Sequence, residues 1–300
     1  MPSQAMQDVI DAEWDRRNAA AGHVAPSLDE QRAAFVPADR LYPIPDDVLV
    51  TDVVAAGVPA HWLETPGTYA GRVLLFLHGG GYRLGSLRSD GELAARLGRA
   101  AGMRVLFLEY RLAPEHPFPA AIDDVRTAWH WLVVDQHLSP SSMALAGDSA
   151  GGGLSVALLV ALRDAGAELP AAAVLMSPTV DLTSSGASMS ERVDQDPIST
   201  PALLRQLSSD YLAGADPKAP LASPLFASLA GLPPLLVQVG TSDLLLSDSE
   251  RLATAAAEAG VDVTLEIGEG LPHVYQSTLG TPEAAEATGQ IGEFLRARLR

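Results

Sequence analysis

A serine between small residues is the first feature of this sequence that could perform covalent chemistry. Gly147-Asp148-Ser149-Ala150-Gly151 fits the pattern G-x-S-x-G, in which small neighbours let a sharp turn project the serine hydroxyl. An apolar run before the motif predicts a strand, and the run after it predicts a helix whose N-terminus favours developing negative charge. This context predicts that Ser149 is a nucleophile in acyl transfer.

A glycine-rich loop, His78-Gly79-Gly80-Gly81, follows another short apolar run. Because glycines leave their backbone N–H groups uncovered, Gly80 and Gly81 could form an oxyanion hole together with the N–H of Ala150. A phosphate-binding loop is the alternative interpretation. Such a loop should continue with Gly-Lys-Ser/Thr, whereas this one continues Tyr82-Arg83-Leu84-Gly85, so the oxyanion hole is favoured.

A serine hydroxyl needs a general base, and the base in turn needs an acid to orient it. His273 lies after the last expected strand and Asp243 after the strand before it, which is the chain order of an α/β-hydrolase triad. Asp248 is the competing acid, but Ser247-Asp248-Ser249-Glu250 is more typical of the N-terminal cap region of a helix. Asp148, beside the nucleophile, is interpreted as a structural hydrogen-bonding residue.

These residues must be positioned by a scaffold, and the apolar pattern indicates which one. Short apolar runs alternate with longer helical patterns along most of the chain, which predicts a mainly parallel sheet covered on both faces. Strands are expected at 48–55, 59–63, 72–77, 104–109, 142–146, 172–176, 234–239 and 262–267, and helices at 86–101, 120–134, 150–165, 249–258 and 283–299.

Two segments depart from this alternation and predict a cap over the site. Residues 1–45 have helical patterns at 6–18 and 28–35, and residues 183–215 contain a further helical pattern at 201–211. An insertion of that length is usually a lid, although a plain surface excursion is the alternative. The expected division is a cap at 1–45 and 183–215 and a core at 46–182 and 216–300. The expected pocket residues are Tyr82, Leu203, Leu207 and Tyr211.

Composition narrows the class of function further. The 300 residues carry 20 basic and 37 acidic side chains, a net charge of −17, which argues against nucleic-acid and anionic-membrane partners and favours neutral substrates. There is no cysteine, so thiol chemistry is excluded. Neither a secretory signal nor an apolar stretch of about 18 residues is visible, so the expected location is the cytoplasm.

In combination these motifs resemble the hormone-sensitive-lipase-like esterases, a bacterial group of α/β hydrolases. The resemblance rests on the two glycine motifs, on Tyr110–Ala121 and on Ser177-Pro178 with Asp181-Leu182. It implies an eight-stranded α/β-hydrolase core with a helical cap and a triad of Ser149, Asp243 and His273. Relatives often form a homodimer through the last strand and helix, here 262–267 and 283–299; the alternative is that this helix only covers the sheet. Asp243-Leu244-Leu245 departs from the Asp-Pro-Leu of many relatives, which weakens any transfer of a specific substrate.

The predicted activity is hydrolysis of small, short-acyl neutral esters through an acyl-enzyme, with no metal and no organic cofactor. A lactone hydrolase or an amidase would use the same triad and is kept as an alternative. An acyltransferase to an alcohol acceptor is a further alternative, and it would need water to be excluded from the pocket. A non-catalytic ligand-binding protein of the same fold is the alternative from another class, although such proteins usually lose a triad residue.

Overall fold

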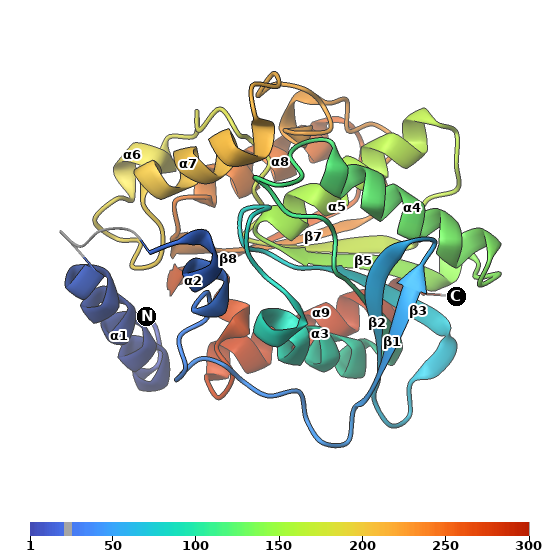
Figure 1. Cartoon of the computed structure of the whole chain (residues 1–300), viewed down its shortest axis with the longest axis horizontal. Coiled ribbons are helices and arrows are strands. Elements are labelled where there is room, and N and C mark those ends of the chain that lie inside the picture. Colours follow the sequence, from blue (N-terminus) through green and yellow to red (C-terminus); the bar gives the residue numbers. More distant parts are fainter. Residues whose placement is uncertain (21–25, 300) are drawn as a thin grey trace.

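A single mixed sheet runs through the centre of the computed structural model, which describes residues 1–20 and 26–299 (Figure 1). Among these residues the sheet has eight strands in the order β1-β2-β4-β3-β5-β6-β7-β8. The strands are β1 (Leu49–Ala55), β2 (Val58–Glu64), β3 (Tyr69–Leu77), β4 (Met103–Leu108), β5 (Met143–Asp148), β6 (Ala172–Met176), β7 (Leu235–Ser242) and β8 (Val263–Pro272). β2 runs antiparallel to both of its neighbours, β1 and β4, and the other neighbouring strands of the described sheet pair in parallel, so the predicted mainly parallel eight-stranded sheet is confirmed.

The central strands contain continuous apolar runs, such as residues 73–77 in β3, because both faces of the sheet are covered. In β3, Val73, Leu75 and Leu77 pack into one core, whereas Leu74 and Phe76 pack into the other. All five side chains are fully buried. Two hydrophobic cores therefore hold the strand ends from which the predicted site residues project.

Helices cover both faces of the sheet (Figure 1). α4 (Ala120–Val134), α5 (Ala150–Asp164) and α8 (Leu246–Glu258) lie on one face, and α3 (Leu87–Ala101) and α9 (Pro282–Arg298) lie on the other. The sequence predicted all five, and the largest deviation is α8, which begins three residues earlier than expected. Short 3-10 turns occupy Pro140–Ser142, Pro224–Phe226 and Tyr275–Ser277.

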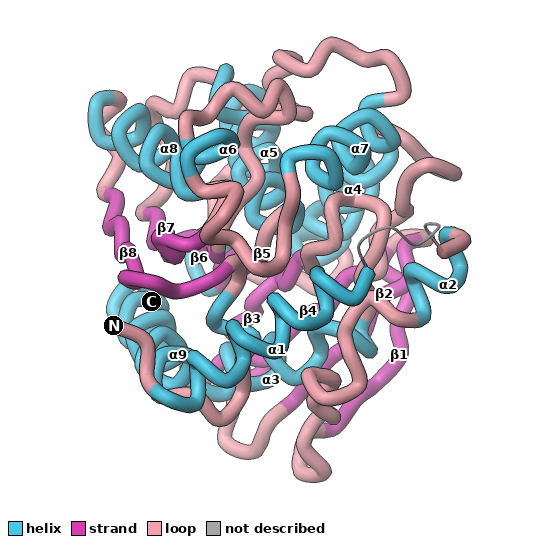
Figure 2. Tube along the Cα trace, turned by 90° about the vertical axis from the view of Figure 1, so that its left-hand side faces the viewer, coloured by secondary structure: helices cyan, strands magenta, loops and turns pink. Residues whose placement is uncertain are grey.

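The two segments predicted as a cap lie beside the layered core, on the side that Figure 2 turns toward the viewer. The first contributes α1 (Gln4–Ala20) and α2 (Leu28–Ala33), and the second contributes α6 (Ser188–Glu191) and α7 (Pro201–Leu212). We refer to residues 1–45 and 183–215 as the cap segments. Residues 21–25 of the first segment, and Arg300 of the core, lie outside the described residues.

Helix α1 is fastened to the core by an apolar contact. Met6 and Ile10 on α1 pack against Leu271, Tyr275 and Ala287. Tyr275 and Leu271 flank the segment that carries His273, so this contact brings the first helix of the chain next to the predicted base. Apolar burial of this kind stabilises by roughly 25 cal/mol per Å².

The long helices at the two ends of the chain are surface elements. α1 and α9 each contain 17 residues, and their buried side chains alternate with charged, exposed ones. Within residues 1–20 and 26–299, no helix is both long enough and apolar enough to cross a membrane.

Candidate active site

Ser149 occupies a strained turn between β5 and α5. Its backbone angles are φ 50° and ψ −117°, a conformation that non-glycine residues rarely adopt. The turn is held by the N–H of Ser149, which donates to the carbonyl oxygen of Met176 at 2.8 Å. Gly151 is required on the helix side because a Cβ there would overlap the carbonyl oxygen of Leu77. The tight turn presents the Ser149 hydroxyl at the end of the sheet.

The structure brings together the three residues predicted as a triad. His273 Nε2 lies 3.1 Å from Ser149 Oγ, and His273 Nδ1 lies 3.0 Å from Asp243 Oδ2. The other carboxylate oxygen of Asp243 accepts the N–H of Leu245 at 2.8 Å. The three side chains come from the ends of β5, β7 and β8, which lie in that order at one side of the sheet. A continuous chain of hydrogen bonds therefore joins a buried carboxylate to the serine hydroxyl.

Opposing effects act on the pKa of His273. Burial lowers it, but the charge and the hydrogen bond of Asp243, followed by the charges of Asp196 and Asp148, outweigh burial and raise it to about 9. The side chain of Asp243 is fully buried, whereas that of His273 is 12% exposed. The imidazolium form is thus stabilised strongly, as a base that receives a proton from serine requires.

The glycine loop lies against the serine turn. Gly80 and Gly81 have φ values of 97° and 62°, which glycine adopts without the steric cost of a Cβ. Both residues line the same cavity as Ser149. Ala150, the third predicted donor, is the buried first residue of α5. Gly80 and Gly81 therefore border the same cavity as Ser149, and Ala150 directly follows the serine at the start of α5.

His78 anchors the start of this loop. Its ring is fully buried and stacks on Tyr110 at a centroid distance of 4.3 Å. Nδ1 lies 2.8 Å from the carbonyl oxygen of Gly79, and the hydroxyl of Tyr110 donates to the carbonyl oxygen of His78 at 2.6 Å. These contacts fix the backbone just before Gly80.

Two cavities meet at Ser149. The larger has a volume of about 200 Å³ and the smaller about 30 Å³, and both are lined by Gly81 and Leu207. Leu203 lines only the larger cavity, and Tyr82 only the smaller one. Cap helix α7 therefore supplies a shared wall between the two spaces on either side of the serine.

Tyr211 does not line either cavity, contrary to the prediction from its helical spacing. Its ring lies behind Tyr82, with the two rings stacked 3.8 Å apart, and Phe118 packs edge-on against its other side. Its side chain is 1% exposed. Tyr211 therefore supports Tyr82, which lines the smaller cavity, without lining the cavity itself.

Asp248 does not cap its own helix, contrary to the prediction. α8 begins at Leu246, so Asp248 lies inside the first turn, and its Oδ2 accepts the N–H groups of Val180 and Asp181, each at 3.0 Å. Burial, with a further contribution from the charge of Asp181, raises its pKa to about 7. Asp248 lines the smaller cavity and is separate from the His273 hydrogen bonds.

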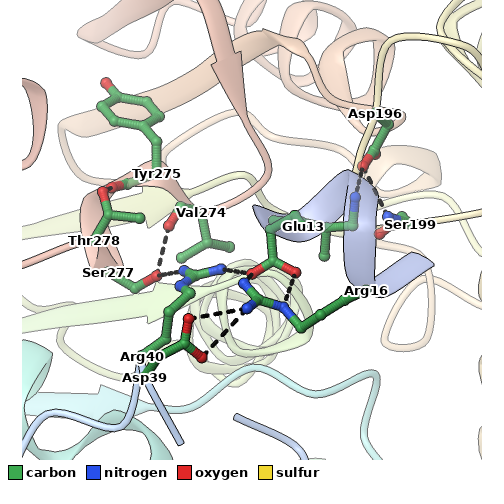
Figure 3. Close-up of polar contacts among 11 residues, drawn as sticks. Glu13, Arg16, Asp39, Arg40, Asp196, Ser199, Val274, Tyr275, Ser277 and Thr278 are labelled. Carbon is green, nitrogen blue, oxygen red and sulfur yellow. Dashed lines mark hydrogen bonds and ion pairs between the residues drawn. The ribbon is translucent and has the colours of Figure 1, made fainter. Parts of the chain in front are cut away.

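An ion-pair network that no sequence motif predicted joins the first cap segment to the histidine loop (Figure 3). Arg40 donates to Glu13 at 2.6 Å and to Ser277 Oγ at 2.9 Å, and Ser277 Oγ donates to the carbonyl oxygen of Val274 at 2.9 Å. Arg16 binds the same carboxylate at 2.8 Å. No local pattern signals this network because its partners are far apart in the chain.

Comparison with known proteins defines first the class and then the family. Residues 74–277 match the family described as the α/β hydrolase fold. The chain is 44% identical to an acetyl-hydrolase of Streptomyces hygroscopicus over 98% of this chain and 95% of that protein. It is 35% identical to an esterase of Acinetobacter venetianus over 85% of this chain and 84% of that protein. The chain therefore belongs to the α/β hydrolases.

Solved structures narrow the assignment. The crystal structure of an esterase from the bacterial hormone-sensitive lipase family superposes with a TM-score of 0.94 at 43% identity, covering 100% of both chains. The protein is a carboxylesterase of this bacterial hormone-sensitive-lipase-like family, as the motifs predicted.

Proposed function

We propose that this esterase hydrolyses small, short-acyl, neutral esters by a two-step acyl-enzyme mechanism with Ser149 as nucleophile. The observation that carries the proposal is the hydrogen-bond chain from Asp243 through His273 to Ser149 Oγ, with distances of 3.0 and 3.1 Å. A nucleophile within reach of a base that is itself oriented by a third group is the arrangement that such catalysis needs.

In the first step His273 Nε2 takes the Ser149 proton while Oγ attacks the ester carbonyl carbon. The N–H groups of Gly80, Gly81 and Ala150 stabilise the negative oxygen of the tetrahedral intermediate. His273 then gives its proton to the departing alcohol, which leaves an acyl group on Ser149. In the second step the same histidine deprotonates a water molecule, and its attack releases the carboxylic acid and restores the serine.

The sizes of the two cavities support a short acyl group. A volume of about 30 Å³ accommodates only two or three groups the size of a water molecule, which suits acetyl or propionyl. The larger space, of about 200 Å³, would then take the alcohol part of the ester. Two relatives are named as acetyl-hydrolases, one of them putative, in agreement with this assignment.

Buried carboxyl groups support a neutral substrate. Asp90 and Asp148 line the larger cavity and Asp248 lines the smaller one. Burial raises the pKa of all three carboxyl groups, so the site disfavours buried negative charge and would disfavour an anionic substrate for the same reason. The net charge of −17 acts in the same direction at long range.

Labelling with a fluorophosphonate probe tests the proposal directly. The wild-type protein is expected to be labelled and a Ser149→Ala variant is not. An ester-cleaving activity that survived in the variant would overturn the mechanism. Wild-type protein that neither labels nor cleaves esters would instead favour the non-catalytic alternative.

A lactone or an amide would react through the same residues, so a panel of matched esters, lactones and amides is needed to rank them. We expect aryl acetates and propionates to be cleaved fastest. An amide bond has a poorer leaving group, so amides should be slower by at least an order of magnitude unless the site protonates that nitrogen well. A maximum at long acyl chains would contradict the short-acyl proposal.

We also propose that the chain forms a homodimer through β8 and α9. β8 is the last strand of the sheet order, so one of its edges is free to pair, and Ile267 on it is 43% exposed. Unpaired strand edges are common association sites. Light scattering after gel filtration, with Ile267→Lys as the variant expected to give a monomer, tests this arrangement.

A further inference from the structure

Asp196 is a buried carboxylate that the second cap segment places beside the Asp243 turn. It lies between α6 and α7, and its side chain is fully buried. Oδ1 accepts the N–H groups of Ile198 at 2.8 Å and Ser199 at 2.7 Å (Figure 3). Oδ2 accepts the N–H of Leu244 at 3.0 Å, across the boundary between cap segment and core. One oxygen thus organises the cap segment and the other holds the core.

The Leu244 contact matters because Leu244 directly follows the proposed triad acid. The cap segment also binds the next peptide group, since Ser188 Oγ donates to the carbonyl oxygen of Leu244 at 2.6 Å. Inside the turn, Leu245 N–H donates to Asp243 Oδ1. The N–H and the C=O of Leu244, between Asp243 and Leu245, are therefore both bound by side chains of the second cap segment.

Asp196 is also close enough to the proposed triad to affect it electrostatically. Burial and the charge of Asp243 raise the pKa of Asp196 to about 6, against the effect of His273 and of the N–H groups of Ser199 and Leu244. Asp196 is therefore ionised above about pH 6. Its charge is among those that raise the pKa of His273.

We infer that Asp196 is a positioning residue of the active centre, which holds the Asp243 turn in place for His273 and adds a second negative charge near the imidazolium. This inference rests on the proposed triad. Through Asp196 the cap segment, in addition to lining the pocket, takes part in building the site where the proton is transferred.

Other charged groups face the same cluster and must be considered in a pH test. Asp243 and Asp148 lie on the core side. Arg17 on α1 donates to the carbonyl oxygens of Asp196 and Ser199, and Arg40 lines the cavity beside His273. Neither arginine is altered in the test variants, so a change in the pH profile on replacing Asp196 reports the carboxylates and the histidine.

The test compares Asp196→Asn with Asp194→Asn. The asparagine keeps an oxygen for Ile198 and Ser199 but turns an NH₂ group toward the Leu244 N–H and removes the charge. We expect kcat on an aryl acetate to fall by roughly ten- to a hundredfold, as small misplacements of catalytic groups do, with KM changed by less than about threefold. Asp194 is exposed two residues away, and its replacement removes the same formal charge and should change neither constant.

The pH profile separates positioning from simple structural support. Removing a negative charge should move the acidic limb of kcat/KM to lower pH by about half a unit or more, whereas loss of fold alone would leave the limb in place. Asp196→Glu keeps the charge on a longer side chain. The acidic limb of its kcat/KM profile should therefore stay near the wild-type position while kcat falls. Unchanged kcat and an unchanged limb in a folded Asp196→Asn protein would refute the inference.

Two measurements make the result independent of the proposed function and of variant folding. Titration of His273 by NMR in a Ser149→Ala background needs no turnover, and the pKa should be lower when Asp196→Asn is added. If the asparagine variant does not fold, the same titration of Asp196→Ser, which also removes the charge, decides: a His273 pKa lower than in the Ser149→Ala protein supports the charge effect, and an unchanged His273 pKa contradicts it. If the fluorophosphonate probe failed to label the wild-type protein, the proposed triad would be contradicted. The titrations of His273 test only the effect of Asp196 on its pKa.

Discussion

The backbone N–H of Gly79 donates to Asp148 Oδ1 at 3.0 Å, which ties the glycine loop to the residue that precedes Ser149. The two sides of the proposed oxyanion hole, one after β3 and the other after β5, are thereby held at a fixed separation. The contact is buried, with Asp148 only 5% exposed, so little water competes for it. Donors held in place before the reaction are what makes such a hole effective.

The Asp148 contact predicts that Asp148→Asn will retain much more activity than Asp148→Ala. Burial, then the nearby charge of Asp90, raises the pKa of Asp148 well above its ordinary value, so an uncharged amide is a close substitute. We expect kcat to fall less than about tenfold for asparagine and roughly ten- to a hundredfold for alanine. Asp164→Ala, at the exposed end of α5, is the control, and equal losses in the two Asp148 variants would contradict the prediction.

The φ of 50° at Ser149 predicts an unusual order of stability. Ser149→Gly and Ser149→Ala both lose the hydroxyl, but only glycine relieves the backbone strain, which costs about 1–3 kcal/mol. The greater conformational freedom of glycine in the unfolded chain offsets roughly 0.5–1 kcal/mol of the stability gained by relieving the strain. Urea unfolding should therefore find Ser149→Gly about 1 kcal/mol more stable than Ser149→Ala. A glycine variant clearly less stable than the alanine variant would show that the turn is not strained.

The raised pKa of His273 predicts an alkaline profile. The base must be neutral to accept the serine proton, and its folded pKa is about 9, so kcat/KM should rise with pH up to about that value. Because the folded pKa exceeds the ordinary value of 6.5, the histidine–carboxylate pair stabilises fully below pH 6.5, and this stability is lost as pH rises through about 9. Initial rates from pH 6 to 10, with unfolding measured in parallel on wild type and His273→Gln, check both statements.

Leu207 and Leu203 offer a matched pair for acyl-chain selectivity. Leu207 borders both cavities and Leu203 only the larger one. Leu207→Ala should enlarge the smaller cavity and move the best substrate from acetate toward butyrate or hexanoate, a change of roughly tenfold in the ratio of kcat/KM values. Leu203→Ala should leave that ratio within about twofold. A p-nitrophenyl ester series measures both, and a shift caused by Leu203→Ala alone would place the acyl group in the larger cavity.

The buried Glu13 predicts an acid-sensitive attachment of helix α1. Burial raises its pKa, but the hydrogen bonds from Arg16 and Arg40 outweigh burial and lower it below 4.5. Its contribution to stability is therefore present above pH 4.5 and is lost as pH falls through the lower folded pKa. At pH 7, Glu13→Gln should cost about 1–3 kcal/mol in urea unfolding, and the difference from wild type should shrink toward pH 3.5. Asp11→Asn, exposed on the same helix, should show neither effect.

The parts of the fold and site that could be predicted from sequence are those encoded by short-range patterns. Continuous apolar runs such as β3 identify strands buried on both faces, and small residues around Ser149 identify a turn that larger ones would block. Chain order then singled out His273 and Asp243, because parallel strands bring their carboxyl ends to one edge. These signals need only a few neighbouring residues or a simple sheet.

The remaining features depend on where helix faces and distant loops meet. Leu203, Leu207 and Tyr211 share one face of α7, but each turn advances about 5.4 Å along the axis. Tyr211 therefore lies past the cavity, stacked on Tyr82. Asp196 resembles any polar loop residue in the sequence, since its burial depends on a contact with Leu244, 48 residues later. No pattern within one segment carries that information.

The long sequence separation of the contacts around His273 has a consequence for how activity is acquired. Arg17 meets the carbonyl oxygen of Asp196 at a separation of 179 residues, and Arg40 meets Ser277 at a separation of 237. Closing such long loops is entropically costly and typically slow compared with local structure formation. Nascent or partly folded chains would then possess a sheet and a serine turn but no working catalyst. Ester cleavage would appear only once opposite ends of the chain have docked, which makes recovery of activity a sensitive reporter of the last step of refolding.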